Sequence, residues 1–189
     1  MMQRLKNRKS PRAKWWDYST PAAYFVTICT KNRLHLFGEI RNGKMQYSPS
    51  GIIANIMWYE IKNHFPCVEL DEFVVMPNHV HGIIIIKPPV VGTGSVVGTG
   101  HVVGTGHVVV GTGHALSLQQ QTQPTLSTIV GSYKSAVTKH CNRMGFPSGW
   151  QTRFYDVIIK SEADFYRIQN YIIQNPENWE NDDLFKENS

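Results

Sequence analysis

This 189-residue chain contains 41% hydrophobic and 11% aromatic residues, which is enough to build the core of one domain and excludes wholesale disorder. Its formal net charge is +5, and its three cysteines lack the CxxC spacing of a thiolate zinc site and do not suggest a disulfide framework. No apolar run approaches the roughly 18 residues of a membrane span, so we expect a cytoplasmic protein with no membrane partner.

The positive charge is concentrated at the start of the chain. Residues 1–14 contain no acidic residue, and their basic residues are Arg4, Lys6, Arg8, Lys9, Arg12 and Lys14. On charge alone, such a segment is equally typical of a solvated tail and of an arm that neutralises nucleic-acid phosphates. We therefore separate a basic N-terminal arm, residues 1–20, from a single domain, residues 21–189.

The first half of that domain alternates between strand and helix patterns. Residues 22–30, rich in β-branched and aromatic side chains, predict a central strand, and the turn residues 41–43 predict a hairpin within 36–48. Residues 48–66 then change to helical spacing, with Ile53, Ile56 and Ile61 recurring on one face until Pro66 ends the helix. Residues 69–77 and 79–87 indicate two strands, or one strand bent at residues 77–78.

A repetitive segment interrupts the pattern. Residues 90–114 repeat Val, Gly, Thr and His with a period of six residues, and a polar bridge follows. A phosphate-binding loop would instead need a single glycine-rich turn between a strand and a helix. We interpret residues 90–123 as a low-complexity insert.

The pattern resumes after the insert. Residues 125–145 predict a helix whose apolar stripe is Leu126, Ile129, Val130, Tyr133 and Val137. Residues 150–160 predict a last strand. Ser161 is a candidate N-cap for a final helix that ends at Pro176. The order of elements indicates an α+β domain with a central antiparallel sheet and helices packed on it.

Two histidines stand at the start of a very apolar strand, in the sequence "MPNHVHGIIII". On a strand, residues i and i+2 share a face, so His79 and His81 point the same way and can bind one divalent metal. The alternative is a pair of half-solvated, hydrogen-bonded imidazoles, which is the commoner role of a bare His-x-His. A metal site needs a third ligand.

The final helix offers a partner for the histidines. Arg167, Tyr171 and Asn175 are spaced i, i+4 and i+8 and form one polar stripe. A tyrosine beside a metal is a plausible nucleophile, because the metal polarises the phosphate that the phenol attacks. Asn175 could supply a carboxamide oxygen to that metal. Tyrosines on amphipathic helices are, however, most often packing residues.

Several stretches, in order, resemble one protein family. They are "DYSTPAAYFVTICTKNRLHLFG", "VELDEFVVMPNHVHGIIII", "GSYKSAV", "WQTRFYDVIIK" and "YIIQNPENW". Together they are similar to the REP-associated tyrosine transposases, within the single-tyrosine HUH transposases. The resemblance implies a ferredoxin-like or RRM-like fold, Mg²⁺ or Mn²⁺ held by His79 and His81, Tyr171 as nucleophile, and Asn175 as a third ligand. Where many relatives carry a histidine in the stretch "FYDVIIK", this chain has Val157.

The resemblance also implies a reaction and a partner. We expect a DNA strand transferase that cleaves and rejoins single-stranded, hairpin-forming DNA through a 5′-phosphotyrosine intermediate, as a monomer or a homodimer. We assign DNA contacts to the basic residues Arg8, Lys9, Arg12, Lys14, Lys134 and Arg167. Two alternatives remain open at this stage: a catalytically silent module that binds DNA or RNA hairpins, and a metal-dependent nuclease that uses water.

Overall fold

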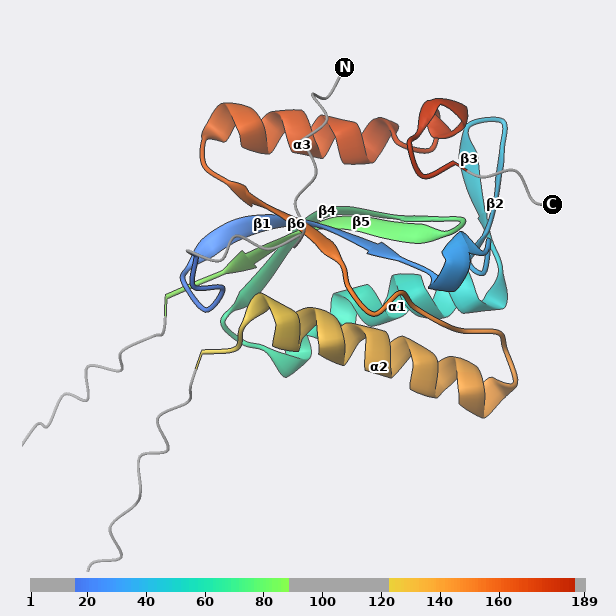
Figure 1. The fold of residues 1–189 in the computed structure, drawn as a ribbon, viewed down its shortest axis with the longest axis horizontal. Helices are drawn as coiled ribbons and strands as arrows, with labels where there is room; N and C mark the ends of the chain where they lie inside the picture. Colours follow the sequence, from blue (N-terminus) through green and yellow to red (C-terminus); the bar gives the residue numbers. More distant parts are fainter. Residues whose placement is uncertain (1–15, 89–122, 186–189) are drawn as a thin grey trace, which may run out of the picture.

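A four-stranded antiparallel sheet forms the middle layer of the molecule, with helices on both faces (Figure 1). The computed structural model describes residues 16–88 and 123–185. Arg8, Lys9, Arg12 and Lys14, and all but the last residue of the predicted insert, therefore lie outside the described residues. The strand order is β4-β5-β1-β6. The expected α+β fold with a central antiparallel sheet is confirmed.

The two inner strands carry the most buried residues. β1 (Ala22–Cys29) pairs antiparallel with both β5 (His79–Ile86) and β6 (Tyr155–Ile159), which confirms its central position. β5 is buried on both faces, as its run of isoleucines predicts. β4 (Val68–Met76) pairs antiparallel with β5, so this stretch forms two strands joined at residues 77–78 and not one bent strand.

Two helices cover one face of the sheet and enclose the larger core. They are α1 (Pro49–His64) and α2 (Leu126–Met144), whose N-caps Ser48 and Thr125 accept hydrogen bonds from backbone N–H groups of the first turn. All five residues of the predicted α2 stripe are buried. The α1 stripe was partly wrong, because Ile56 is 49% exposed while Trp58 is fully buried.

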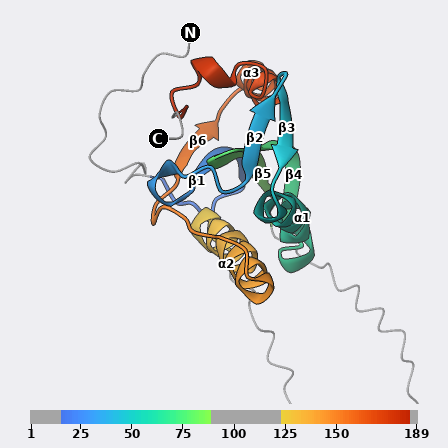
Figure 2. The same cartoon turned by 90° about the vertical axis from the view of Figure 1, so that its right-hand side faces the viewer.

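A third helix lies alone on the opposite face. α3 (Glu162–Gln174) begins after Ser161, whose hydroxyl accepts a hydrogen bond from the N–H of Asp164, as predicted. Ile168 and Ile172 pack against Phe25 and Ile83 in a second, smaller core. Figure 2 shows the resulting layers, with α3 above the sheet and α1 and α2 below it.

Short elements occupy one end of the sheet. The predicted hairpin is present as β2 (Gly38–Arg41) and β3 (Lys44–Tyr47), and Asn42 and Gly43 have the positive φ angles of a tight turn. Two 3-10 helices, η1 (Lys31–Arg33) and η2 (Trp179–Asn181), complete the described elements. These elements gather at the end of the sheet where β4 turns into β5 (Figure 1).

The last described residues return to that end of the sheet. We call residues 179–185 the C-terminal segment. The side chain of Asn78 donates a hydrogen bond to the carbonyl of Leu184 at 2.9 Å, and the ring of Trp179 packs edge-on against Phe185. The segment is therefore attached to the turn between β4 and β5.

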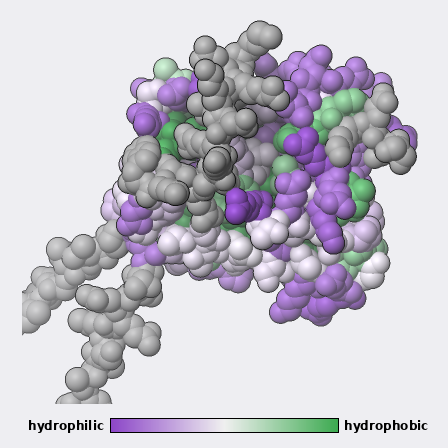
Figure 3. All heavy atoms as spheres, viewed as in Figure 1, coloured by the Kyte–Doolittle hydropathy of each residue, from purple (hydrophilic) through white to green (hydrophobic). Residues whose placement is uncertain are grey.

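One face of the molecule can be followed in a space-filling view. On the face drawn in Figure 3, hydrophobic residues form small separate patches among hydrophilic and neutral ones. Among the described residues, no helix has the length and apolar character needed to cross a membrane.

Gly82 allows the sheet to approach α1, and this gives a test of the packing. A Cβ atom added to Gly82 would lie 2.2 Å from the ring of Trp58, whereas one added to Gly131, inside α2, would meet nothing within 4 Å. Gly82→Ala should lower the free energy of unfolding by about 1–3 kcal/mol through overpacking. Gly131→Ala should raise it by up to about 1 kcal/mol, because alanine favours helix. Urea unfolding of both variants measures this, and equal effects would contradict the packing described.

Candidate functional site

The two histidines of β5 lie side by side on the face of the sheet that α3 covers. Their ring centroids are 4.3 Å apart, as expected for residues i and i+2 of a strand. His79 is 0% and His81 2% exposed. The half-solvated pair considered from the sequence is therefore not what the structure contains. Two buried imidazoles need partners, because unpaired polar groups in an interior are destabilising.

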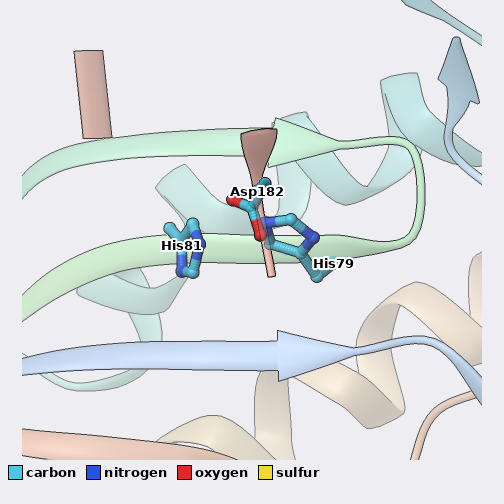
Figure 4. Close-up of side chains that lie close together, drawn as sticks. All are labelled: His79, His81 and Asp182. Carbon is cyan, nitrogen blue, oxygen red and sulfur yellow. The ribbon is translucent and has the colours of Figure 1, made fainter. Parts of the chain in front are cut away.

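A carboxylate completes the cluster. One ligand atom each from His79, His81 and Asp182 lies within 4.8 Å of the other two. Figure 4 shows both imidazoles projecting from β5 and the side chain of Asp182 beside them, on a different segment of the chain. Asp182 belongs to the C-terminal segment, so this segment brings a third donor to the two that the strand supplies.

Neighbouring side chains contact both ring nitrogens of His81 but only one of His79. His81 Nδ1 lies 2.9 Å from the hydroxyl of Thr27, and its Nε2 lies 3.2 Å from the hydroxyl of Tyr171. His79 Nδ1 lies 2.8 Å from Asn78 Oδ1. His79 Nε2 is buried and has no hydrogen-bond partner among the described residues.

The polar stripe of α3 reaches this cluster with two of its three members. Tyr171 donates to Asp182 Oδ2 at 3.4 Å, and Asn175 Nδ2 donates to the same oxygen at 2.9 Å. Asn175 is buried, and its Oδ1 atom has no partner among the described residues. Arg167, the third member, is exposed and forms an ion pair with Asp164 at 2.8 Å.

Lys134 lies on α2, the layer below the sheet. It donates to the carbonyl of Gln151 at 2.6 Å, so it holds the loop that leads to β6. Val157, at the position where the resemblance leads us to expect a histidine, pairs with Phe25 and packs in the smaller core. Position 157 therefore provides a hydrophobic contact in place of an imidazole.

Burial sets the protonation of these groups in the metal-free protein. Burial lowers the pKa of His81 to about 4, against a weaker opposite effect of the Asp182 carboxylate. Burial, followed by the neighbouring His81, lowers the pKa of His79 well below its ordinary value. Both imidazoles are therefore neutral at physiological pH, which is the form that binds metals.

The pKa of the candidate nucleophile, Tyr171, is shifted upward. Burial raises the pKa of the Tyr171 phenol above its ordinary value of 10, and the negative charge of Asp182 raises it further. The phenol is accordingly protonated at neutral pH in the absence of a cation. A positive charge among these donors reverses that electrostatic effect.

The donor set fits a divalent metal. Two neutral imidazoles and one carboxylate are ligands of divalent first-row metals, and an orphaned, buried Nε2 lone pair on His79 is a position that a cation satisfies. Asn175 Oδ1, also orphaned, lies on the residue that hydrogen-bonds Asp182. These observations indicate a metal site without specifying the ion.

The sequence pattern did not reveal Asp182. It lies in an acidic stretch after the final helix, where neither helical nor strand periodicity relates it to the histidines. The only signal was a cluster of acidic residues, Glu180, Asp182 and Asp183, which contributes negative charge near the end of the chain. Thr27 was hidden in the same way, within a strand that reads as purely structural.

The lowered pKa of His81 predicts acid sensitivity of the metal-free fold. A pKa of about 4 in the folded state and 6.5 in the unfolded state means that the unfolded chain binds the proton more tightly between these values. The free energy of unfolding should be highest above pH 6.5 and fall below it, by about 2 kcal/mol at pH 5 for this group, at about 1.4 kcal/mol per pKa unit. Urea unfolding with a chelator at pH 7.5 and 5 measures the fall.

Two variants assign that fall to the buried histidine. His81→Gln should flatten the pH dependence, whereas His64→Gln, at an exposed position of α1, should leave it unchanged. Equal stability of the wild-type protein at pH 7.5 and 5 would contradict the burial argument.

Comparisons with known proteins identify relatives. No family model matches the chain. An uncharacterized protein of Haemophilus influenzae is 36% identical over 183 residues, which cover 96% of this chain and 94% of that protein. Among solved structures, a REP-associated tyrosine transposase bound to a REP hairpin matches with a TM-score of 0.50 and 16% identity, over 89% of this chain and 74% of that one.

At that level of identity, the structural match establishes the fold alone. It confirms the fold that the resemblance implied, with its antiparallel sheet and covering helices. The sequence match is close enough and long enough to establish kinship. This chain belongs to the same family as the Haemophilus influenzae protein, and its fold is that of the REP-associated tyrosine transposases.

Proposed function

We propose that this protein is a transposase that cleaves and rejoins single-stranded, hairpin-forming DNA through a 5′-phosphotyrosine intermediate, with Mg²⁺ or Mn²⁺ as cofactor. The observation that carries the proposal is the position of one hydroxyl. Tyr171 Oη lies 3.2 Å from His81 Nε2 and 3.4 Å from Asp182 Oδ2. The candidate nucleophile thus contacts two atoms of the candidate metal site.

The metal would be held by His79, His81 and Asp182, with Asn175 Oδ1 as a further donor. Bound there, a divalent cation supplies positive charge that polarises the scissile phosphate and favours ionisation of the nearby phenol. Attack on a phosphodiester needs both effects, because a protonated phenol is a weak nucleophile.

The reaction conserves the energy of the phosphodiester bond. Tyr171 Oη forms a bond to phosphorus as the bond from phosphorus to the 3′ oxygen breaks, and the leaving oxygen takes up a proton to become a 3′-OH. Asp182 Oδ2, which accepts the hydrogen bond of Tyr171, is placed to receive the phenolic proton. Attack by another 3′-OH on the phosphotyrosine reverses the step and joins the new strand. No nucleotide cofactor is needed.

The other tyrosines of this region are less suitable. Tyr166 lies on α3 five residues before Tyr171, is 56% exposed, and donates to Glu162 at 3.2 Å. Its direction on the helix differs by about 140° from that of Tyr171. Tyr155 begins β6 and is partly exposed.

DNA contacts complete the proposal. The basic arm, including Arg8, Lys9, Arg12 and Lys14, would neutralise phosphates of the incoming strand. Arg167 is exposed one turn before Tyr171 on the same helix, where it could contact the strand beside the nucleophile. Lys134 lies on the far side of the sheet and is half-buried, so its contribution would require exchange of its bond to the Gln151 carbonyl.

The central prediction concerns the tyrosine. Tyr171→Phe removes one oxygen and little volume, so DNA binding and the fold should persist while the covalent adduct disappears. The assay is incubation with a labelled single-stranded hairpin and Mn²⁺, followed by denaturing electrophoresis for a stable protein–DNA adduct. Tyr166→Phe is the matched control and should form the adduct at the wild-type rate.

Other results would select the alternatives. An adduct formed by the Tyr171→Phe variant would point to a different nucleophile, with Tyr155 the next residue to replace. Cleavage without an adduct, in the wild type and the variant alike, would identify a nuclease that uses water. Binding of the hairpin by the wild type without either product would identify a silent binding module.

A second prediction separates the two candidates for the third ligand. Asp182→Asn keeps the size of the side chain but removes its charge, and it should weaken Mn²⁺ binding about 10-fold or more. Asp183→Asn, at an exposed neighbour outside the cluster, should have no effect. Isothermal titration of metal-free protein with Mn²⁺ measures both. If Asn175→Ala abolishes binding while Asp182→Asn does not, the third ligand is Asn175, as the sequence pattern suggested.

A further inference from the structure

We propose that Asn78 is a positioning residue that fixes His79 in the tautomer with its proton on Nδ1, and thereby directs the Nε2 lone pair toward the metal site. This inference rests on the proposed function for the identity of the ligand, and it deepens that function by naming the group that prepares it. Asn78 occupies the turn between β4 and β5, directly before His79.

The tautomer follows from the two bonds of one carboxamide. Asn78 Nδ2 lies 2.9 Å from the carbonyl oxygen of Leu184, and a carbonyl can only accept, so this atom of the carboxamide is the donor nitrogen. The other atom, Oδ1, then faces His79 Nδ1 at 2.8 Å. A carboxamide oxygen can only accept, so Nδ1 carries the proton.

The consequence appears at the other side of the ring. A neutral imidazole with its proton on Nδ1 presents a lone pair at Nε2. That atom is buried and has no partner within the described residues, in a side chain that is 0% exposed. An unsatisfied buried acceptor destabilises a fold. The same arrangement, donor nitrogen anchored and acceptor nitrogen free, is what a metal ligand requires.

The backbone of Asn78 is held by the residue that follows β1. The N–H of Thr30 donates to the backbone carbonyl of Asn78 at 2.9 Å, and the Thr30 hydroxyl lies between that oxygen, at 3.0 Å, and the carbonyl oxygen of Leu34, at 2.7 Å. Thr30 and Asn78 are fully buried. Exchange of the side-chain oxygen and nitrogen of Asn78 would place Oδ1 against the carbonyl oxygen of Leu184, where neither atom can donate.

Asn78 also links two ligands of the same centre. The residue whose carbonyl it binds, Leu184, donates its own N–H to Asp182 Oδ1 at 2.6 Å. One side chain therefore supports the imidazole of His79 directly and the carboxylate of Asp182 through one intervening residue. Loss of the carboxamide should disturb both, but only the first effect involves the tautomer.

Two variants separate these effects. Asn78→Asp retains an oxygen acceptor for His79 Nδ1 and loses the donor to Leu184, whereas Asn78→Ala loses both. The probe of the tautomer is long-range ¹H–¹⁵N correlation NMR of the metal-free protein with ¹⁵N-labelled histidine. The wild type and Asn78→Asp should show His79 protonated at Nδ1, and Asn78→Ala should show loss of this pattern. Asn63→Ala, at an exposed site of α1, is the control.

Metal affinity is the second measurement. Asn78→Ala should weaken Mn²⁺ binding about 10- to 100-fold, the usual effect of losing a group that orients a ligand. Asn78→Asp should bind Mn²⁺ more tightly than Asn78→Ala. Because the wild-type spectrum needs no variant, the proposal stays testable even if a variant does not fold.

The following results would overturn the proposed role of Asn78. His79 protonated at Nε2 in the metal-free wild type, or an unchanged tautomer and Mn²⁺ affinity in Asn78→Ala, would refute the positioning role. Absence of Mn²⁺ binding in the wild type would overturn the metal-dependent function and, with it, Nε2 as a ligand. Mn²⁺ binding with the expected tautomer but no DNA adduct would overturn strand transfer alone and leave the role of Asn78 supported.

Discussion

The register of β5 between its two neighbours is the constraint on which the site depends. Because side chains alternate along a strand, a shift of one residue would move both imidazoles from the α3 face into the larger core. The pairing of His81 with Thr27 on one side and with Val74 on the other fixes this register. Gly82 reinforces it, since only a residue without a side chain fits beneath Trp58. The packing on one face of the sheet thus determines the chemistry on the other.

The two faces of the sheet differ in how much apolar packing they contain. The larger core, under α1 and α2, contains most of the buried hydrophobic residues, and the smaller core under α3 contains only four buried ones among the described residues. The polar cluster lies beside the smaller core, where it interrupts little apolar packing. Hydrogen bonds with Thr27, Asn78 and Asn175 compensate part of the burial of polar groups there, and His79 Nε2 and Asn175 Oδ1 are the atoms of the cluster left unpaired among the described residues. The fold can therefore hold a polar centre without sacrificing the contacts that stabilise it.

Local patterns in the sequence were sufficient for most of the fold and part of the site. Strand alternation placed His79 and His81 together, and helical spacing placed Tyr171 and Asn175 on one face, since both depend only on neighbouring residues. The inward face of α1 was misjudged at Ile56, because several apolar residues compete there and tertiary packing chose Trp58. Asp182 could not be linked to the histidines from the sequence. Its position arises from the path of the C-terminal segment, which no periodicity encodes.

The repetitive segment and the histidine cluster lie at opposite ends of β5. The repetitive segment follows β5 after Ile86, at the opposite end of the strand from His79, a span of about 23 Å at ~3.3 Å per residue. Lengthening a connection costs only about 0.6 kcal/mol for each doubling, so the number of repeats there can change at little cost in stability. The histidine cluster, by contrast, depends on the fixed spacing of strand, turn and helix at the other end of β5. The length of a single strand thus separates a connection whose length is nearly free to change from side chains whose positions are not.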